Sequence, residues 1–571
     1  MRRSFTLLSI LTAFSAPALA DTIYVDPNAS GGDSGESWVD AHTSLQHALD
    51  RVRYGDEIWV AAGEFFPTRR ADNEMPDLLS DDPRDATFWI PRGVRLIGGF
   101  AGHETSPDQR QIGIHVSTLN GDIGTPGDHA DNAHRVVLYQ SFHGGGYGSS
   151  DSDQIIGALI DGFRVINGNA QDSTDIDNVG IGGGGLLFRS YSVDNATYAA
   201  KIDARNCEIA YNRTDYKGAG MSIGMVFGTI TDCHFHDNFA MENGGGLSVG
   251  SVVGVPESVH TFNITGCSFI ENTAVKSGGA FHQASANAPN LSQLPNRTYI
   301  NNCVFLRNTA QTRDGGAIWY NDLGSNPASL FVSNSLLAQN SAGQEGGAIF
   351  ITSYIAGPAV IHSDAWVFNC TIADNTAGVA GGALYIGTHG EAEVHNSILW
   401  GNTAPTDAQI NDNNRATLIA NIVDGGFGTN DFTFNTDTDP RFLDPANDDY
   451  SLRNDSPAIN AAWDPYLPLD IADLDRDSNF TESSPFDLAG IPRRLNAGRT
   501  PSGLGITPLV DYGAYERCNA DMNRDGRADF YDVTAMIRGY LDANPDADLN
   551  ADGQHSVDDL LRFLSSFDEG C

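Results

Sequence analysis

Short stretches in which apolar and polar residues alternate make up much of the chain, and one such pattern recurs seven times between residues 206 and 402. It consists of Cys or Ser, an apolar residue two positions later, and Asn three positions after that. The copies begin at Cys207, Cys233, Cys267, Cys303, Ser335, Cys370 and Ser397 and end at Asn212, Asn238, Asn272, Asn308, Asn340, Asn375 and Asn402. Alternation places one side of an extended chain in a core, and no stretch keeps helical spacing for long. Each copy therefore predicts a short β-strand.

A second pattern, glycines followed by small and then apolar residues, lies between most copies of the first. It starts at Gly244, Gly278, Gly315, Gly346 and Gly381. Glycine permits a sharp corner at positive φ, and an Asn at the same point of every coil can form a ladder of amide hydrogen bonds. Successive Asn residues are 26 to 36 residues apart, which suits a solenoid with loops of different lengths. The two patterns together predict a parallel β-helix.

The combination of Phe-x-x-Asn (Phe235 to Asn238, Phe269 to Asn272, Phe305 to Asn308) with Gly-Gly-Ala-Ile (Gly315 to Ile318, Gly346 to Ile349) resembles a known repeat. It is similar to the repeat of chlamydial polymorphic outer-membrane proteins and related bacterial β-helix surface proteins. The resemblance covers about a third of the chain and implies an all-β, right-handed parallel β-helix. It implies little about activity, because one fold hosts many functions.

The first twenty residues have the features of a secretory signal peptide: basic residues, an apolar run, and Ala18-Leu19-Ala20 before the expected cleavage site. No later run of about 18 apolar residues appears. We therefore expect a secreted or surface-attached protein without a membrane span.

Four further regions follow the expected signal peptide. Residues 21–137 should form an N-terminal cap with a short amphipathic helix at 45–52 and the first coils. Residues 138–406 should hold the main repeats, and residues 407–516 the last coils and a C-terminal cap. This last region resembles the C-terminal segment of bacterial β-helix proteins that exchange one surface anchor for another. Residues 517–571 form a separate module.

The chain carries 33 basic and 73 acidic residues, a formal net charge of −40. Such a surface repels nucleic acid, and it serves either solubility or cation binding. Five of the seven cysteines share one repeat position, where we expect buried thiols stacked in the core.

The C-terminal module contains two 12-residue patterns of oxygen ligands, 27 residues apart. The expected calcium ligands are Asp521, Asn523, Asp525, Arg527, Asp529 and Asp532 in the first loop and Asp548, Asn550, Asp552, Gln554, Ser556 and Asp559 in the second. Arg527 and Gln554 would contribute backbone carbonyls, and Gly526 and Gly553 would supply the sharp turn. We expect two calcium ions and a helix after each loop, over residues 533–541 and 560–567.

Asp at the twelfth position, with a helix after each loop, resembles the dockerin module, in a variant that ends in Gly-Cys. The resemblance implies a cohesin-like or other surface partner. Positions 10 and 11, which dockerins use to read their partner, are Phe530-Tyr531 and Val557-Asp558 rather than the usual Ser or Thr. Cys518 and Cys571 flank the module and are expected to form a disulfide; a free terminal thiol used for attachment is the alternative.

The sequence contains no recognisable catalytic motif, and the repeat strands lack the Asp-Asp pair of polygalacturonase-like enzymes. Charged residues nevertheless gather in the turns before the glycines: Asp215, Lys217, Glu242, Lys276, Arg313, Asp314 and Glu345. This edge could bind an acidic sugar together with calcium, or its charges could simply be solvated. His234 and His236, which should point outward together, allow the same two interpretations.

A sharper candidate is the residue that follows the apolar position of the glycine pattern. On four consecutive coils it is His282, Trp319, Phe350 and Tyr385. If the register holds, these rings form an outward ladder with rungs about 5 Å apart, suited to contact with sugar rings. Loops or a neighbouring protein covering the strip would be the alternative.

The sequence thus favours an exported carbohydrate-binding or adhesive β-helix protein, attached or assembled through a calcium-dependent module. The alternative is a polysaccharide lyase or glycoside hydrolase acting on acidic polysaccharide, and a purely structural adhesin would be a third. Whether the protein is an enzyme stays open at this point.

Overall fold

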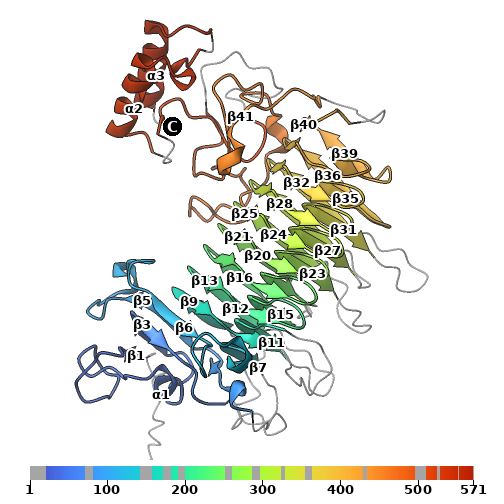
Figure 1. Ribbon diagram of the computed structural model, residues 1–571. Coiled ribbons are helices and arrows are strands. Elements are labelled where there is room, and N and C mark those ends of the chain that lie inside the picture. The colour runs from blue at the N-terminus through green and yellow to red at the C-terminus, as the bar shows by residue number, and fades with distance from the viewer. Residues whose placement is uncertain are drawn as a thin grey trace, which may run out of the picture.

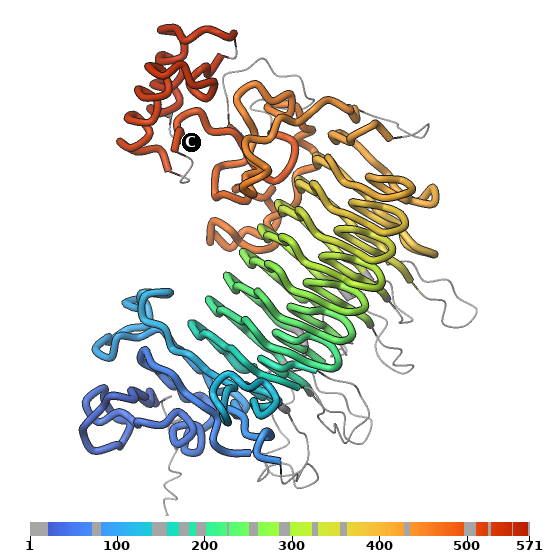
Figure 2. The backbone as a smooth tube through the Cα atoms, viewed as in Figure 1, coloured from blue at the N-terminus to red at the C-terminus, as the bar shows by residue number. Residues whose placement is uncertain are grey.

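The computed structural model describes residues 21–70, 82–141, 157–170, 182–190, 200–224, 226–250, 260–285, 296–322, 328–353, 363–427, 434–495, 510–523, 527–550 and 552–569. Within these residues the chain forms a parallel β-helix followed by a small helical module (Figure 1). The coils stack along one axis from the N-terminal region to the orange C-terminal region (Figure 2). The predicted fold class is confirmed.

Four long sheets, of twelve, eleven, ten and seven strands among the described residues, run along the stack. The twelve-stranded sheet contains β1 (Thr22–Val25), β2 (Glu57–Ala61), β5 (Arg95–Phe100), β8 (Gly157–Asp161), β12 (Ala200–Arg205) and β16 (Val226–Thr231). It continues with β20 (His260–Thr265), β24 (Asn296–Asn301), β28 (Ala328–Ser333), β32 (Ser363–Phe368), β36 (Gly390–His395) and β39 (Ala416–Ile419). The seven strands β12, β16, β20, β24, β28, β32 and β36 precede the Cys or Ser of the seven repeats.

The eleven-stranded sheet holds the predicted strands of the first pattern. It consists of β3 (Gly63–Phe65), β6 (Ser117–Asn120), β9 (Phe163–Ile166), β13 (Glu208–Ala210), β17 (His234–His236), β21 (Ser268–Ile270), β25 (Val304–Leu306), β29 (Leu336–Ala338), β33 (Thr371–Ala373), β37 (Ile398–Trp400) and β40 (Ile422–Val423). The seven-stranded sheet begins with β10 (Asn169–Ala170) and continues with short strands that follow the repeat Asn: β14 (Arg213–Thr214), β18 (Phe239–Ala240), β22 (Thr273–Ala274), β26 (Thr309–Ala310), β30 (Ser341–Ala342) and β34 (Thr376–Ala377).

The strands of the glycine pattern lie in the ten-stranded sheet. Its members are β4 (Phe88–Trp89), β7 (Val137–Ser141), β11 (Leu186–Ser190), β15 (Met221–Gly224), β19 (Leu247–Val249), β23 (Phe281–Ser285), β27 (Ile318–Asp322), β31 (Ile349–Ser353), β35 (Leu384–Ile386) and β38 (Ile410–Asn411). The corner before β19, β23, β27, β31 and β35 uses the first glycine of the pattern at positive φ, for example 68° at Gly315. A side chain there would meet the carbonyl oxygen of Ile318 at 2.4 Å, so the corner requires glycine.

The repeat Asn residues form the predicted ladder through the buried interior. From Asn212 to Asn375, the Nδ2 of each Asn donates to the Oδ1 of the Asn one coil further on, over 2.8–3.1 Å. The ladder ends at Asn402, whose Nδ2 donates to Gln409 Oε1 at 2.7 Å. Each coil is thereby bonded to the next within the core as well as along its strands.

The cysteines of the repeat behave as predicted. Cys207, Cys233, Cys267, Cys303 and Cys370 are free and at most 2% exposed. Burial raises the pKa of the Cys207, Cys233, Cys267 and Cys370 thiols, so these sulfurs pack as apolar groups. Next to them the repeat Phe rings stack, with centroids 4.7 and 4.8 Å apart from Phe235 through Phe269 to Phe305.

Helix α1 (Leu45–Leu49) closes the N-terminal end, three residues shorter than predicted. Its Leu45, Ala48 and Leu49 are buried in the same core as the coils. At the other end, the chain beyond β40 does more than cap the last coil, because it runs back beside the solenoid (Figure 1). It includes the hairpin of β41 (Phe442–Asp444) and β42 (Asp449–Leu452), and it accepts side-chain hydrogen bonds from Asn302, Asn334 and Asn396 at the coil corners.

The C-terminal module contains α2 (Phe530–Leu541) and α3 (Val557–Glu569), so both predicted helices exist and each begins three residues earlier than predicted. Met536, Ala547, Leu549 and Phe563 form its small core. Cys518 is disulfide-bonded; Cys571 lies outside the described residues, as do the expected signal peptide and the ligand Asp525. In the described part of the chain, no helix combines the length and apolar character needed to cross a membrane.

Candidate functional site

The predicted strip on the ten-stranded sheet has the expected register. His282, Trp319, Phe350 and Tyr385 occupy paired positions on β23, β27, β31 and β35. Their rings are parallel within 8°, with centroids 4.5, 6.3 and 5.3 Å apart. Their exposure differs from the prediction, however, because His282 is 3% and Phe350 7% exposed, while Trp319 and Tyr385 are half-buried. Most of the ring surface therefore stabilises the stack of coils and is not available to a ligand.

The charged edge, for which the sequence allows either an acidic-sugar site or simple solvation, lies beside this strip, at the residues before the corner glycines. Lys276 Nζ contacts Glu242 Oε1 at 2.5 Å, and Glu345 N donates to Asp314 Oδ1 at 3.2 Å. Burial, together with the negative charge of Glu345, raises the pKa of Asp314 to about 6. An acid with a pKa near neutrality can transfer protons at physiological pH, so Asp314 is the strongest proton-transfer candidate on this edge.

His234 and His236 lie together on β17, with ring centroids 4.5 Å apart. His236 Nε2 is 3.2 Å from Glu208 Oε1, and His236 Nδ1 is 2.8 Å from Asp237 Oδ2. The hydrogen bond that His236 donates to Glu208 is the main cause of its raised pKa. Both rings are half-buried. His236 forms an ion-pair cluster with its two neighbouring acids on the wall of the β-helix, whereas His234 Nδ1 contacts Ser268 Oγ.

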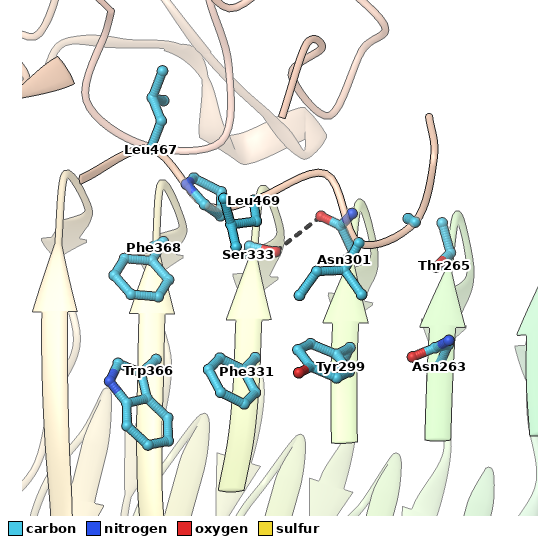
Figure 3. Close-up of a pocket in the computed structure, with 13 residues that line it drawn as sticks. Asn263, Thr265, Tyr299, Asn301, Phe331, Ser333, Trp366, Phe368, Leu467 and Leu469 are labelled. Carbon is cyan, nitrogen blue, oxygen red and sulfur yellow. Dashed lines mark hydrogen bonds between the residues drawn. The ribbon is translucent and has the colours of Figure 1, made fainter. Parts of the chain in front are cut away.

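A second aromatic ladder, on the outer face of the twelve-stranded sheet, forms the floor of a groove (Figure 3). Tyr299, Phe331 and Trp366 occupy paired positions on β24, β28 and β32. Their centroids are 4.7 and 4.6 Å apart, with angles of 16° and 9° between the rings. Since touching carbons need about 3.5 Å, rings at these spacings are offset and each shields only part of the next. All three are half-buried, so part of each ring faces the groove.

One wall of this groove comes from the chain that runs back along the solenoid. Leu467, Pro468, Leu469, Ile471 and Ala472 line that side, and the cavity they enclose with the sheet is about 270 Å³. Leu469 is 53% exposed at the rim. The wall follows the 3-10 turn η6 (Asp464–Tyr466), whose Tyr466 ring stacks on His395 at 4.2 Å. A segment more than 70 residues from β36 in sequence thus completes the site.

Polar side chains lie at one end and along one side of the aromatic floor. Asn263 continues the row of Tyr299, while Thr265, Asn301 and Ser333 form the parallel row that ends at Phe368. Ser333 Oγ donates to Asn301 Oδ1 at 2.9 Å. Among the described residues that line the groove, none is Asp, Glu, Lys, Arg or His. An apolar floor with a few amide and hydroxyl groups is a typical arrangement for a small-molecule or sugar site.

Sequence reasoning missed this groove although its floor has a sequence signal. Tyr299, Phe331 and Trp366 each lie four residues before the Cys or Ser of the repeat. The same position is Asn263 one coil earlier and Glu393 one coil later, so only three coils are aromatic. Counting backward from the repeat would have found the floor, but the wall at residues 467–472 has no repeat to mark it.

The described parts of the two calcium loops have a matching hydrogen-bond pattern. The Asp532 carboxylate accepts hydrogen bonds from the backbone N–H groups of Asn523 and Asp529, and the Asp559 carboxylate accepts them from those of Asn550 and Ser556. Asp532 and Asp559 are 0% exposed, and Asp521 and Asp548, at the first position of each loop, are 6% and 8% exposed. Buried carboxylates that tie the start of a loop to its end fit the oxygen-rich coordination that calcium requires.

Comparison with known proteins gives matches at the level of structure alone. No protein-family model and no curated protein matches the chain. Among solved structures, the pectate lyase Pel9A matches with a TM-score of 0.43 and 13% identity, over 88% of this chain and 97% of that one. A rhamnogalacturonan lyase matches with a TM-score of 0.35 and 13% identity, over 70% of this chain and 87% of that one. At this level of similarity the matches assign no activity to the chain.

Proposed function

We propose that this protein is an extracellular carbohydrate-binding protein that holds a polysaccharide chain in the groove over Tyr299, Phe331 and Trp366. The groove is the observation that carries the proposal, since it combines a half-buried aromatic floor with amide and hydroxyl groups. Sugars present both C–H faces and hydroxyl groups, so they match such a surface. The lack of charged residues among those described in its lining favours binding over acid–base chemistry at this place.

A substitution of Trp366 tests this proposal. Trp366→Ala removes the largest ring of the floor and should weaken binding to a recognised polysaccharide about tenfold, the effect of about 1.4 kcal/mol. Affinity electrophoresis against a panel of neutral and acidic polysaccharides, followed by calorimetry on any ligand found, measures the change. As a control, Tyr54→Ala removes a ring that is 60% exposed at the N-terminal end of the β-helix, and it should leave the affinity for polysaccharide unchanged.

Trp319→Ala distinguishes the two ladders in the same experiment. Loss of affinity in Trp319→Ala with full affinity in Trp366→Ala would move the site to the sequence-predicted strip on the ten-stranded sheet. Equal affinity of both variants and the wild type for every bound polysaccharide would exclude both aromatic surfaces.

The second candidate function is a polysaccharide lyase or hydrolase, and the specific observation that favours it is the raised pKa of Asp314 beside Glu345. The named similar structures are also lyases. Incubation of the calcium-loaded protein with the same panel, with unsaturated uronates and reducing ends measured together, tests for activity. Product that disappears in Asp314→Asn would make the edge an active site; no product from any polymer would exclude this candidate for the panel.

We further propose that the C-terminal module binds calcium and docks the protein to a cohesin-like or other surface partner. Exposed apolar side chains on its two helices support docking. Phe530, Tyr531 and Leu541 are 74%, 70% and 75% exposed on α2, and Val557, Leu561 and Leu564 are 64%, 58% and 57% exposed on α3. Phe530, Tyr531 and Val557 occupy positions that dockerins use to contact their partner. Exposed apolar groups of this size commonly mark protein interfaces. Secretion of the mature chain, as the signal sequence suggests, would bring the module to such a partner.

A further inference from the structure

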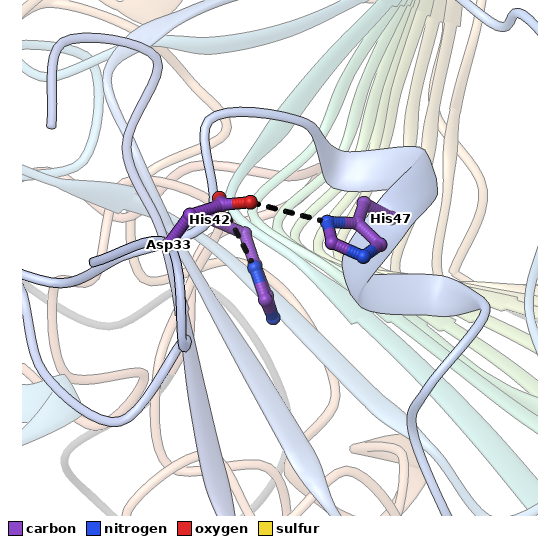
Figure 4. A group of neighbouring side chains, drawn as sticks. All are labelled: Asp33, His42 and His47. Atoms are coloured by element: carbon purple, nitrogen blue, oxygen red, sulfur yellow. Dashed lines mark hydrogen bonds and ion pairs between the residues drawn. The ribbon is translucent and has the colours of Figure 1, made fainter. Parts of the chain in front are cut away.

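A cluster of two imidazoles and one carboxylate lies in the N-terminal cap, far in sequence from the groove and from the calcium loops (Figure 4). His42 Nδ1 is 3.3 Å from Asp33 Oδ1, and His47 Nδ1 is 3.5 Å from Asp33 Oδ2. Both rings thus direct the same kind of nitrogen toward one carboxylate, from the loop before α1 and from α1 itself.

These distances fit metal coordination better than a pair of strong hydrogen bonds. Hydrogen bonds from a charged donor to a carboxylate are usually about 2.7–2.9 Å long. Ligands on a tetrahedral Zn²⁺ with bonds of about 2.0–2.1 Å are separated by about 3.3–3.4 Å, the edge of the tetrahedron. The ligand atoms of the three residues all lie within 4.8 Å of one another, and the three residues form a group that could hold a metal ion.

The backbone holds the three ligands in place. His42 is 2% exposed at its side chain, and its backbone exchanges two hydrogen bonds of 2.9 Å with Tyr24 and Asp26 of the first coil. Asp33 adopts φ of 54° in a loop closed by the bonds from Gly31 N to Val39 O and from Gly35 N to Asp40 O, of 3.1 and 2.8 Å. Thr43 N donates to Asp33 Oδ1 at 3.2 Å, an outer contact of the kind that orients metal-binding carboxylates.

We infer that Asp33, His42 and His47 form a Zn²⁺ site that fastens the loop over residues 31–43 to the cap helix. Two imidazoles and a carboxylate are a ligand set that zinc prefers and that calcium, which selects oxygen, does not. The side chains of Asp33 and His47 are 47% and 36% exposed, so an ion can enter from solvent and keep a fourth position for water or an external ligand. The site is independent of the proposed carbohydrate groove.

Titration with Co²⁺ and Zn²⁺ tests the site in the full mature protein, after chelation and with calcium in excess so that the oxygen loops are filled. The wild type should bind one Co²⁺ with the visible absorption of a tetrahedral complex, and Zn²⁺ should displace it and raise the thermal midpoint. His47→Ala and Asp33→Asn should lower Co²⁺ affinity at least about tenfold, since even loss of an outer-shell contact costs that much.

Neither His47→Ala nor Asp33→Asn should unfold the protein, so a loss of Co²⁺ affinity would report the loss of a ligand. His47 lies at the surface of α1, and Asn tolerates the positive φ of Asp33 as well as Asp does. His103→Ala, an exposed histidine elsewhere in the cap, should bind Co²⁺ as the wild type does. Absence of a Co²⁺ complex in the wild type, or wild-type affinity in both His47→Ala and Asp33→Asn, would overturn the inference.

Discussion

Asn308 illustrates how one buried side chain joins three coils. Its Nδ2 donates to Phe269 O and to Asn340 Oδ1, at 2.8 and 2.9 Å. Its Oδ1 accepts from Asn272 N and Nδ2 at 3.0 and 3.1 Å. The side chain is fully buried, so water cannot replace any of these bonds. The repeat of Asn in sequence is therefore explained by hydrogen bonding, because among neutral side chains only the amides of Asn and Gln donate and accept twice, and Gln is one methylene longer.

Asn308→Ala should destabilise the solenoid by about 3–5 kcal/mol, because it leaves several buried polar groups unpaired at about 1–3 kcal/mol each. Denaturant unfolding followed by tryptophan fluorescence measures the loss. Asn447→Ala removes one exposed bond, to Asp444 Oδ2, and should change the free energy of unfolding by less than about 0.5 kcal/mol. Similar values for the two variants would show that the ladder contributes little.

At the scale of the element, the strands that carry a repeat signal were predictable and the rest were not. The Cys-to-Asn pattern predicted the eleven-stranded sheet, and the glycine pattern predicted strands such as β23 and β27. The first four strands of the twelve-stranded sheet lie in stretches expected to form the first coils, but those from β12 onward were not predicted, because their outward positions change from coil to coil, from Asn263 to Tyr299 to Glu393. Only the inward positions, such as Ile300 and Val332, are regularly apolar. The candidate groove lies on the irregular face, so periodicity alone could not reveal it.

Removal of calcium should loosen the C-terminal module while the solenoid stays intact. Asp521, Asp532, Asp548 and Asp559 are nearly fully buried, and without a cation these negative charges would repel one another. Hydrogen exchange should therefore show loss of amide protection in α2 and α3 on chelation, with little change in β20 to β32.

Asp559→Ala should reproduce much of the effect of chelation in the second loop even with calcium present. Asp568→Asn, an exposed acid at the end of α3, is the matched control and should behave like the wild type. Unchanged exchange of both helices on chelation would contradict calcium binding by the module.

At the scale of the whole molecule, a buried arginine is one of the residues that join the returning C-terminal chain to the coils. Arg493 is 0% exposed and donates to Asn334 Oδ1 from Nε and Nη2, at 3.1 and 2.8 Å, and from Nη1 to Glu516 Oε1 at 2.8 Å. Asp487 and Asp511 lie in the same buried network; burial raises their pKa values to about 6 and about 7, and it also raises the pKa of Glu516. This connection helps to hold the segment that forms the groove wall, so the groove depends on contacts between residues more than 150 positions apart.

Arg493→Met should cost about 3–5 kcal/mol at pH 8, because it leaves buried carboxylates without their cation. The pH dependence has a defined sign. An acid whose pKa is raised in the folded state binds more protons there than in the unfolded state, in the pH range between the two pKa values. For these acids that range runs from about pH 4, near the ordinary carboxyl pKa, to about pH 7. Stability therefore increases as the pH falls from 7 to 4. Loss of Arg493 raises these pKa values further, so the variant should be most destabilised above pH 7 and should recover in part at pH 5.

Proteolysis of the returning segment between pH 5 and pH 8 measures both the loss of stability and its pH dependence. Arg453→Met, at a largely exposed ion pair, is the control. Equal cleavage of the two variants across this range would show that the buried arginine does not hold the wall in place.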